Sequence, residues 1–365
     1  MHKSVFVVAA FIVLMLISPL TQPAIAQAHG FTTRTITVQS LMPIARPSPD
    51  GTLIAVFHQP AIHDSTPLDR YLWLIDARTG DEVATLHDAT TTISDVAFSA
   101  DGSRLVAVQT NGDVYVWDTL SQRLLDVLTM PFYGGVHSLR FVQDSAQVVF
   151  VHGSRPSQIA FLDTDTGSIT RTLAPNFDTL TEFNEIMSDV MRSGDHVFTS
   201  ADLTPDADMV AVATANDGVF LWDVDTRERT AIGSQAAAVM GFGVSELAFS
   251  ADGTRLVYAM PRDGRVVLHD IVDGTEGTVA ITANAFALAP DGDHLVWAQH
   301  EPAFVFVAPL DAPEAAEALL ELPGNPRFAP RLSALHFAAD GNLVVLSGLL
   351  GDDGDNALYL FERAR

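Results

Sequence analysis

A ten-residue pattern that recurs seven times constrains the fold of this chain more than any other feature. Most copies have a small residue, an aspartate two positions later, a glycine after the aspartate, and then a run of apolar residues. The copies lie about 48 residues apart on average, and a period of this length is typical of folds built from repeated units. The copies are SPDGTLIAVF from Ser48, SADGSRLVAV from Ser99, VQDSAQVVFV from Val142, TPDADMVAVA from Thr204, SADGTRLVYA from Ser250, APDGDHLVWA from Ala289 and AADGNLVVLS from Ala338.

The pattern predicts a β-hairpin with two further strands behind it. In the second copy, the alternating segment 93–98 leads into the Asp-Gly turn, where glycine adopts the positive φ that the turn requires, and an apolar strand follows. Segments 114–118 and 123–129 then supply a third and a fourth strand. Seven such units of four antiparallel strands predict an all-β fold, a seven-bladed β-propeller.

The two ends of the chain are expected to complete the ring together. The last unit supplies only three strands, at 333–337, 343–347 and 357–361, whereas segment 32–38 precedes the first copy and belongs to no other unit. We expect segment 32–38 to pair beside the last strand, because closure of the ring removes an exposed sheet edge. The predicted propeller therefore occupies residues 32–365.

The repeat units resemble those of the WD40-repeat family and its bacterial relatives. The family's Trp-Asp pair occurs as Trp117-Asp118 and Trp222-Asp223, and its Ser-x-Asp-Gly turn occurs repeatedly. The Gly-His pair that opens the family's repeats is missing, and only His87 stands in a similar place, so the family's hydrogen-bonded set of His, Ser/Thr, Asp and Trp is incomplete in every blade. The resemblance implies a rigid surface that is presented to partners, although a fold by itself does not determine a function.

Residues 1–26 have the features of a secretory signal peptide. A short start with Lys3 precedes an apolar run from Val5 to Ile17, and Ala24-Ile25-Ala26 forms a small-x-small cleavage pattern. The apolar run is short for a membrane span, and an uncleaved anchor is the alternative. We therefore expect export to the periplasm or the extracellular medium, with no membrane span after signal removal.

The formal net charge of −25 at pH 7 restricts the partners of the chain. A field of this sign repels phosphate backbones and anionic membranes, so we expect no nucleic-acid binding, and it favours cations and basic partners. Cysteine is absent, which excludes disulfides, thiolate metal sites and thiol nucleophiles. Lys3 is the only lysine, so removal of the signal peptide would also remove any lysine for Schiff-base chemistry.

Alignment of the seven copies places several charged side chains on the innermost strands, where they are expected to converge on a central channel. The positions compared are two residues apart and therefore share one strand face. We expect a wet channel lined by ion pairs, with a small-ligand or cation site as the alternative. The channel candidates are Arg46, Asp95, Arg140, Asp202, Glu246 and His336.

The long connections are expected to gather on one face, because links between second and third strands and between blades leave the same side of a propeller. Insertions on one side of a rigid scaffold are typical of a binding surface. In the longest insertion, 175–195, apolar residues at helical spacing predict a short amphipathic helix at 180–192, which either packs on its own propeller or docks a partner. Candidate residues on this face are His58, His63, His152, Arg155, Phe183 and Met187.

Only two segments resemble metal-binding loops, and neither is a complete motif. Asp352, Asp353 and Asp355 form an acidic loop that is weighed as a Ca²⁺ site against a plain solvated loop. Segment 163–167 matches the start of a calcium-binding loop but lacks the distal glutamate, so we expect an ordinary turn. We expect no cofactor other than this Ca²⁺.

The function expected from the sequence is a non-enzymatic exported scaffold. It would bind a protein, peptide or glycan partner through its loop-rich face, and we expect a monomer. The chain has no Gly-x-Ser-x-Gly nucleophile motif. Two alternatives stay open, a channel-mouth hydrolase that is lactonase-like or metal-assisted, and a TolB-like factor of cell-envelope assembly.

Overall fold

The computed structural model describes the strands and turns that set the architecture of the 365-residue chain. The residues described are 31–38, 43–58, 72–86, 89, 91–130, 136–142, 145–152, 158–173, 198–214, 218–232, 246–250, 252–260, 265–279, 283, 285–300, 303–322, 331–349 and 356–363.

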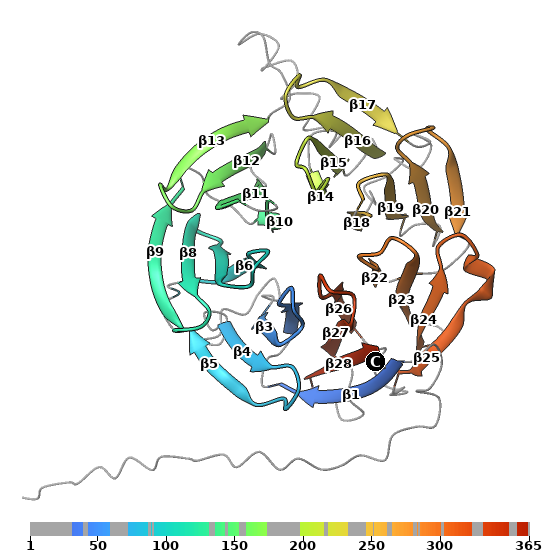
Figure 1. Ribbon diagram of the computed structural model, residues 1–365, viewed down its shortest axis with the longest axis horizontal. Helices are drawn as coiled ribbons and strands as arrows, with labels where there is room; N and C mark the ends of the chain where they lie inside the picture. The colour runs from blue at the N-terminus through green and yellow to red at the C-terminus, as the bar shows by residue number, and fades with distance from the viewer. Residues whose placement is uncertain are drawn as a thin grey trace, which may run out of the picture.

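The described residues form seven four-stranded antiparallel sheets arranged in a ring (Figure 1). Blade 1 consists of β2 (Pro43–Pro47), β3 (Leu53–His58), β4 (Leu72–Asp76) and β5 (Glu82–Leu86). Blade 2 consists of β6 (Ile93–Phe98), β7 (Arg104–Gln109), β8 (Asp113–Asp118) and β9 (Arg123–Thr129), and blade 3 of β10 (Val136–Phe141), β11 (Gln147–His152), β12 (Gln158–Asp163) and β13 (Ser168–Leu173). Blade 4 consists of β14 (Phe198–Leu203), β15 (Met209–Thr214), β16 (Gly218–Asp223) and β17 (Arg229–Ile232).

The remaining three blades continue the ring in chain order. Blade 5 consists of β18 (Glu246–Phe249), β19 (Arg255–Met260), β20 (Arg265–Asp270) and β21 (Glu276–Val279). Blade 6 consists of β22 (Ala285–Leu288), β23 (His294–His300), β24 (Ala303–Pro309) and β25 (Glu317–Glu321), with the 3₁₀ helix η4 (Pro313–Ala315) between its last two strands. Blade 7 consists of β26 (Arg331–Phe337), β27 (Leu343–Leu349), β28 (Asn356–Arg363) and β1 (Phe31–Thr37).

Blade 7 closes the ring by combining the two ends of the described chain. The strand β1 pairs antiparallel with β28 from Phe31 opposite Arg363 to Thr37 opposite Ala357. This pairing confirms the closure predicted from segment 32–38. The strand β1 is the outer strand of blade 7 and lies next to β28, so the first and the last strand of the described chain share one sheet (Figure 1).

The hydrophobic core consists of seven clusters, each lying between two consecutive blades. Blade 7 shows how alternation along a strand serves two clusters. Val344 and Phe361 pack toward blade 6, whereas Val345 and Leu360 pack toward blade 1, and all four side chains are fully buried. Each sheet is therefore apolar on both faces, and no blade can bury its faces without both neighbours.

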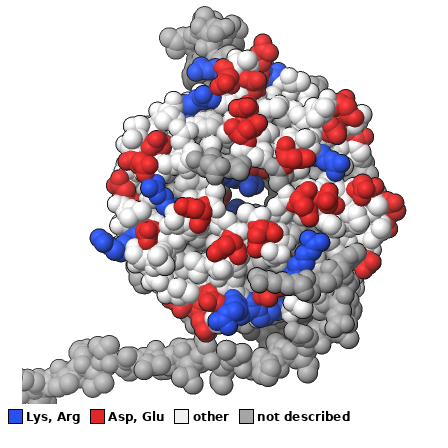
Figure 2. All heavy atoms as spheres, viewed as in Figure 1, with Lys and Arg blue, Asp and Glu red and all other residues white. Residues whose placement is uncertain are grey.

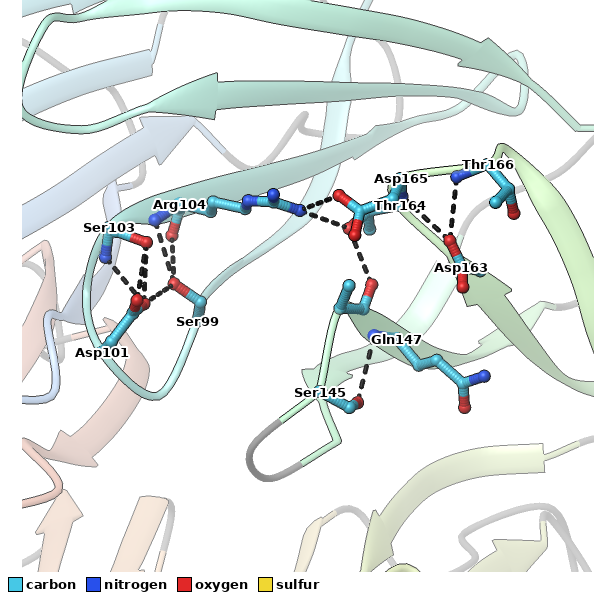
Figure 3. A network of polar contacts seen from close by, with 11 residues as sticks. Ser99, Asp101, Ser103, Arg104, Ser145, Gln147, Asp163, Thr164, Asp165 and Thr166 are labelled. Atoms are coloured by element: carbon cyan, nitrogen blue, oxygen red, sulfur yellow. Dashed lines mark hydrogen bonds and ion pairs between the residues drawn. The ribbon is translucent and has the colours of Figure 1, made fainter.

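The Ser-x-Asp-Gly pattern forms the turn between the first and second strands of a blade (Figure 3). In blade 2, Ser99 Oγ donates to Asp101 Oδ1 at 2.6 Å, and the same carboxylate accepts the backbone N–H and the hydroxyl of Ser103. Gly102 has a φ of 70°, the left-handed conformation that glycine adopts at no steric cost. These hydrogen bonds, first of all that of Ser99, lower the pKa of Asp101 to about 2, so the turn keeps its charge.

No helix within the described ranges is long and apolar enough to span a membrane. The predicted signal peptide, residues 1–26, and the helix predicted at 180–192 lie outside the residues that the structure describes.

Candidate functional site

A hollow lies at the centre of the face shown in Figure 2, and basic side chains are visible inside it. The innermost strands of the seven blades surround the ring axis (Figure 1). The structure brings five of the six predicted channel residues into two groups on these strands. The sixth, Glu246, lies in β18, and its side chain is outside the described part of the structure.

The first group joins blades 1, 2 and 3 through one carboxylate. Arg46 Nη2 of β2 lies 3.0 Å from Asp95 Oδ1 of β6, and the backbone N–H of Leu139 in β10 donates to Asp95 Oδ2 at 3.1 Å. The side chain of Asp95 is 7% exposed, and that of Arg46 is 25% exposed. Asp95 thus neutralises an arginine of the preceding blade and holds the backbone of the following one.

The second group repeats this arrangement two blades further on. Arg140 Nε of β10 lies 2.5 Å from Asp202 Oδ1 of β14, and the N–H of Phe249 in β18 donates to Asp202 Oδ2 at 2.9 Å. Burial raises the pKa of Asp202, and Arg140 together with the N–H groups of Phe249 and Leu203 opposes the rise. Asp202 connects blades 3, 4 and 5 as Asp95 connects blades 1, 2 and 3.

His336 extends the first group across the closure of the ring. Arg46 Nη1 donates to Nε2 of His336 in β26, so this nitrogen is unprotonated and blade 7 is linked to blade 1. Burial lowers the pKa of His336 well below its ordinary value, and the guanidinium groups of Arg46 and Arg140 lower it further. The corresponding positions of blades 5 and 6 are Ala248 and Ala287, so the charged contacts run from blade 7 round to blade 5.

These side chains are already bonded to one another and to the backbone. The carboxylates of Asp95 and Asp202 accept backbone N–H groups and arginines, and Nε2 of His336 accepts from Arg46. The described residues of the channel therefore serve as connections between blades.

We expect the neutral state of His336 to make the stability of the protein depend on pH. The unfolded chain binds a proton near pH 6.5, and the folded protein does so only at lower pH. The contribution of His336 to stability is therefore complete above about pH 6.5 and falls as the pH decreases towards the folded pKa, by about 1.4 kcal/mol per pH unit at most.

The test compares urea unfolding of wild type and His336→Gln at pH 7.0 and pH 5.5. The variant removes this one titration, so its free energy of unfolding should decrease less over the interval than that of wild type. Equal decreases would show that His336 is not the group responsible.

The loop-face candidates lie mostly outside the described residues. His58 is the last residue of β3, is 2% exposed and pairs in register with Pro43, so it lies inside blade 1. His152 ends β11, and its side chain is not among those described. The candidates outside the described residues are His63, Arg155, Phe183, Met187, Asp352, Asp353 and Asp355.

No group of three or more His, Asp or Glu side chains within the described ranges is arranged to hold a metal ion. Segment 163–167 is an ordinary turn, as the sequence predicted. Asp163 Oδ1 accepts the backbone N–H groups of Asp165 and Thr166, and Gly167 has a φ of 67°. Arg104 of blade 2 bonds to Asp165 at 2.6 Å, so this turn also connects two blades (Figure 3).

The face in Figure 2 is predominantly acidic around the central hollow. Aspartates of the turns remain charged, because hydroxyl and N–H donors of the same turn lower the pKa of Asp101, Asp206 and Asp252. Arginines at the blade boundaries bond to turns of the following blade. Arg34 does so at the carbonyls of Ala77 and Arg78.

Comparison with known proteins agrees with this architecture. Residues 80–118, which include most of blade 2 and the Trp117-Asp118 pair, match the family model described as WD domain, G-beta repeat. This match lies within a complete ring of seven four-stranded blades. The chain is a WD40-like β-propeller.

A solved β-propeller domain has the same overall architecture. The crystal structure of the β-propeller domain of Cps50 (Swd1) from Myceliophteria thermophila superposes with a TM-score of 0.65 and 13% sequence identity, covering 90% of this chain and 99% of that domain. At this identity the likeness concerns the fold alone. No curated protein sequence matches the chain.

The propeller departs from the family pattern at its tryptophans. Trp117 is 1% exposed, and its Nε1 has no hydrogen-bond partner among the described residues. This agrees with the incomplete hydrogen-bonded set noted in the sequence. The indole of Trp117 instead stacks on the ring of Tyr115 at a centroid distance of 5.5 Å, so packing holds this side chain in place.

Proposed function

We propose that this WD40-like propeller is an exported, non-enzymatic scaffold that binds a protein, peptide or glycan partner through the face with the long connections. The observation that carries the proposal is that the central charged side chains bond to one another and to the backbone of neighbouring blades. Asp95 and Asp202 each accept from an arginine of the preceding blade and from a backbone N–H of the following blade, so each joins three blades. A rigid ring whose centre is occupied by structural contacts leaves its outer faces and loops for recognition.

The sequence supports the choice of face. The longest connections between the strands are 59–71, 174–197 and 233–245. Each follows a second strand or joins two blades, so it starts on the side opposite to the Asp-Gly turns. The Asp-Gly turns are short and tied by their own hydrogen bonds. Variation in length is therefore concentrated on one side of a fixed scaffold.

The test is quantitative capture of a partner by three purified forms of the propeller. One form is wild type, the second has residues 60–69 and 175–195 replaced by short Gly-Ser links, and the third carries Asp225→Asn on the opposite face. We expect a partner from the envelope or medium fraction to bind wild type and the third form equally and to lose at least about tenfold in affinity for the second. Equal binding to all three forms would refute the proposed face, and a partner from the cell-envelope assembly machinery would identify the TolB-like variant of this function.

Export has its own prediction. The mature protein is expected to begin at Gln27 after cleavage behind Ala26. Sequencing of the amino terminus after expression in the native host, with fractionation of cells and medium, measures this directly. A protein that retains residues 1–26 and stays in the cytoplasmic fraction would contradict it.

A further inference from the structure

The short connection between β7 and β8 in blade 2 contains a chemically reactive pair, Asn111-Gly112. It is the only Asn-Gly pair in the chain. An asparagine that precedes glycine is prone to spontaneous deamidation, because glycine has no side chain to hinder the approach of its backbone nitrogen to the asparagine amide. The pair lies in a turn that the structure describes completely, so its reactivity can be read from the hydrogen bonds of that turn.

Deamidation has two steps and consumes only water. In the first, the backbone nitrogen of Gly112 loses its proton and forms a bond to Cγ of Asn111. The bond from Cγ to Nδ2 then breaks, and Nδ2 leaves as ammonia after it takes up a proton. In the second step, water opens the cyclic imide at one of its two carbonyls and gives aspartate or isoaspartate. The first step therefore requires a free Gly112 N–H and an Asn111 side chain that can turn towards it.

The backbone of Gly112 is held on both sides. Its N–H donates to the carbonyl of Gln109 at 3.0 Å, and its carbonyl accepts the N–H of Met130 at 3.0 Å. Gly112 has a φ of 90°, which suits the last position of a three-residue hairpin loop. Its nitrogen cannot lose the proton to water unless the turn opens.

A single aspartate fixes the amide of Asn111. Asn111 Nδ2 donates to Asp113 Oδ2 at 2.7 Å, and Asn111 Oδ1 accepts the backbone N–H of Asp113 at 3.0 Å. The other oxygen of this carboxylate, Asp113 Oδ1, accepts the hydroxyl of Thr129 in the outer strand at 2.8 Å. Asp113 thus ties the asparagine side chain to the rest of the blade.

The charge of Asp113 acts in the same direction as its hydrogen bonds. Removal of the proton from Gly112 creates a negative charge on the nitrogen next to this carboxylate in the chain. Two negative charges at such a distance repel each other, so the reactive form of Gly112 is disfavoured.

We propose that Asn111 is a latent site of spontaneous deamidation and that the carboxylate of Asp113 keeps it intact while the turn is folded. The reaction would place a second carboxylate beside Asp113. As isoaspartate it would also lengthen the backbone of the three-residue connection by one methylene. The product therefore cannot keep the hydrogen bonds that protect Asn111.

The site goes beyond the function proposed above and does not depend on it. The turn joins a second strand to a third, so it lies on the side of the long connections. A propeller that binds no partner on this side would deamidate at the same rate. Failure of the proposed binding face and failure of the deamidation site are therefore separate results.

The test is the rate of deamidation of the purified full chain in mildly alkaline buffer, measured by mass spectrometry. Trypsin cleavage after Arg104 and Arg123 gives the peptide 105–123, in which Asn111 is the only asparagine. We expect Asn111 in the folded wild type to react at least about tenfold more slowly than in the same chain unfolded in guanidinium chloride, because reaction requires local opening.

A matched pair of variants in blade 2 identifies the protecting group. Asp113→Ala should raise the rate in the folded protein by about tenfold or more, because a charge-assisted hydrogen bond no longer holds the amide. The exposed carboxylate of Asp126 accepts the N–H of Val127 and does not contact Asn111, so Asp126→Ala should stay within about twofold of wild type. Thermal unfolding of both variants checks that the fold is retained.

Thr129→Val decides the matter if Asp113→Ala does not fold. It removes the hydroxyl that holds Asp113 Oδ1 but keeps the carboxylate, so the rate should rise by a smaller factor, about threefold.

Three outcomes would overturn the proposal. The first is equal deamidation of folded and unfolded wild type, which would show that the turn gives no protection. The second is a folded Asp113→Ala variant, or in its place Thr129→Val, that reacts at the wild-type rate, which would assign the protection to the backbone alone. The third is an Asn111 that stays intact even in the unfolded chain.

Discussion

A chain that lacks residues 31–37 is expected to lose the stable closed ring. The strand β1 pairs along its whole length with β28, and it contributes Phe31 and Ile36, both 8% exposed, to the two clusters that flank blade 7. Loss of two large buried side chains costs about 5 kcal/mol or more. That is comparable to the whole stability of an ordinary domain, about 5–15 kcal/mol.

The measurement is differential scanning calorimetry of the full chain and of the truncated chain. The truncated chain should unfold on the order of 10 °C lower or show no cooperative transition. It should also associate with itself, since β28 becomes an exposed edge next to open apolar surface. A transition like that of the full chain would show that the ring does not depend on β1.

A peptide of residues 31–38 provides the control for this experiment. Added to the truncated chain, it should restore part of the transition, because it can pair with β28 in the register from Phe31 to Thr37. A peptide of the same composition in scrambled order should not. Stabilisation should increase with the concentration of the native peptide, as expected for a ligand that binds only the folded state.

The fold was predictable because its signal repeats. A single Asp-Gly turn between apolar strands indicates only a hairpin, but seven copies fix the number of blades, and the short last unit indicates closure by the first strand. The predicted limits 93–98 and 123–129 coincide with β6 and β9. The apolar runs are strong because every sheet is covered on both faces, as in the fully buried segment Ile54 to Phe57 of blade 1.

The central contacts were predictable only in part. Strand alternation placed Arg46, Asp95 and His336 around one axis, and the structure brings these three together. The alignment gave no sign of the backbone partner of Asp95, since the N–H of Leu139 has no signature in the side-chain pattern. That partner depends on how far neighbouring inner strands are displaced along each other, which the sequence of one blade does not encode.

Asp95→Ala is expected to lower the free energy of unfolding by about 3 kcal/mol or more. The substitution leaves Arg46 without its carboxylate and leaves the N–H of Leu139 without its acceptor, in a place where the Asp95 side chain was 7% exposed. A buried group that loses its partner is not compensated by water. The effect should be large because one carboxylate holds three blades.

An exposed ion pair between blades provides the matched comparison. Asp165 bonds to Arg104 across blades 2 and 3 at 2.6 Å, but their side chains are 56% and 32% exposed. Asp165→Ala should therefore cost only about 0–1 kcal/mol. Urea unfolding followed by tryptophan fluorescence measures both variants under the same conditions.

A double-mutant cycle with Arg46→Ala then separates the ion pair from the backbone contact. If Arg46 is the main partner, Asp95→Ala should cost much less in the Arg46→Ala background than in wild type. If the N–H of Leu139 matters more, most of the cost should persist in that background. Equal effects of Asp95→Ala and Asp165→Ala in wild type would contradict the central claim, because burial rather than the number of charges is what makes Asp95 a connection between blades.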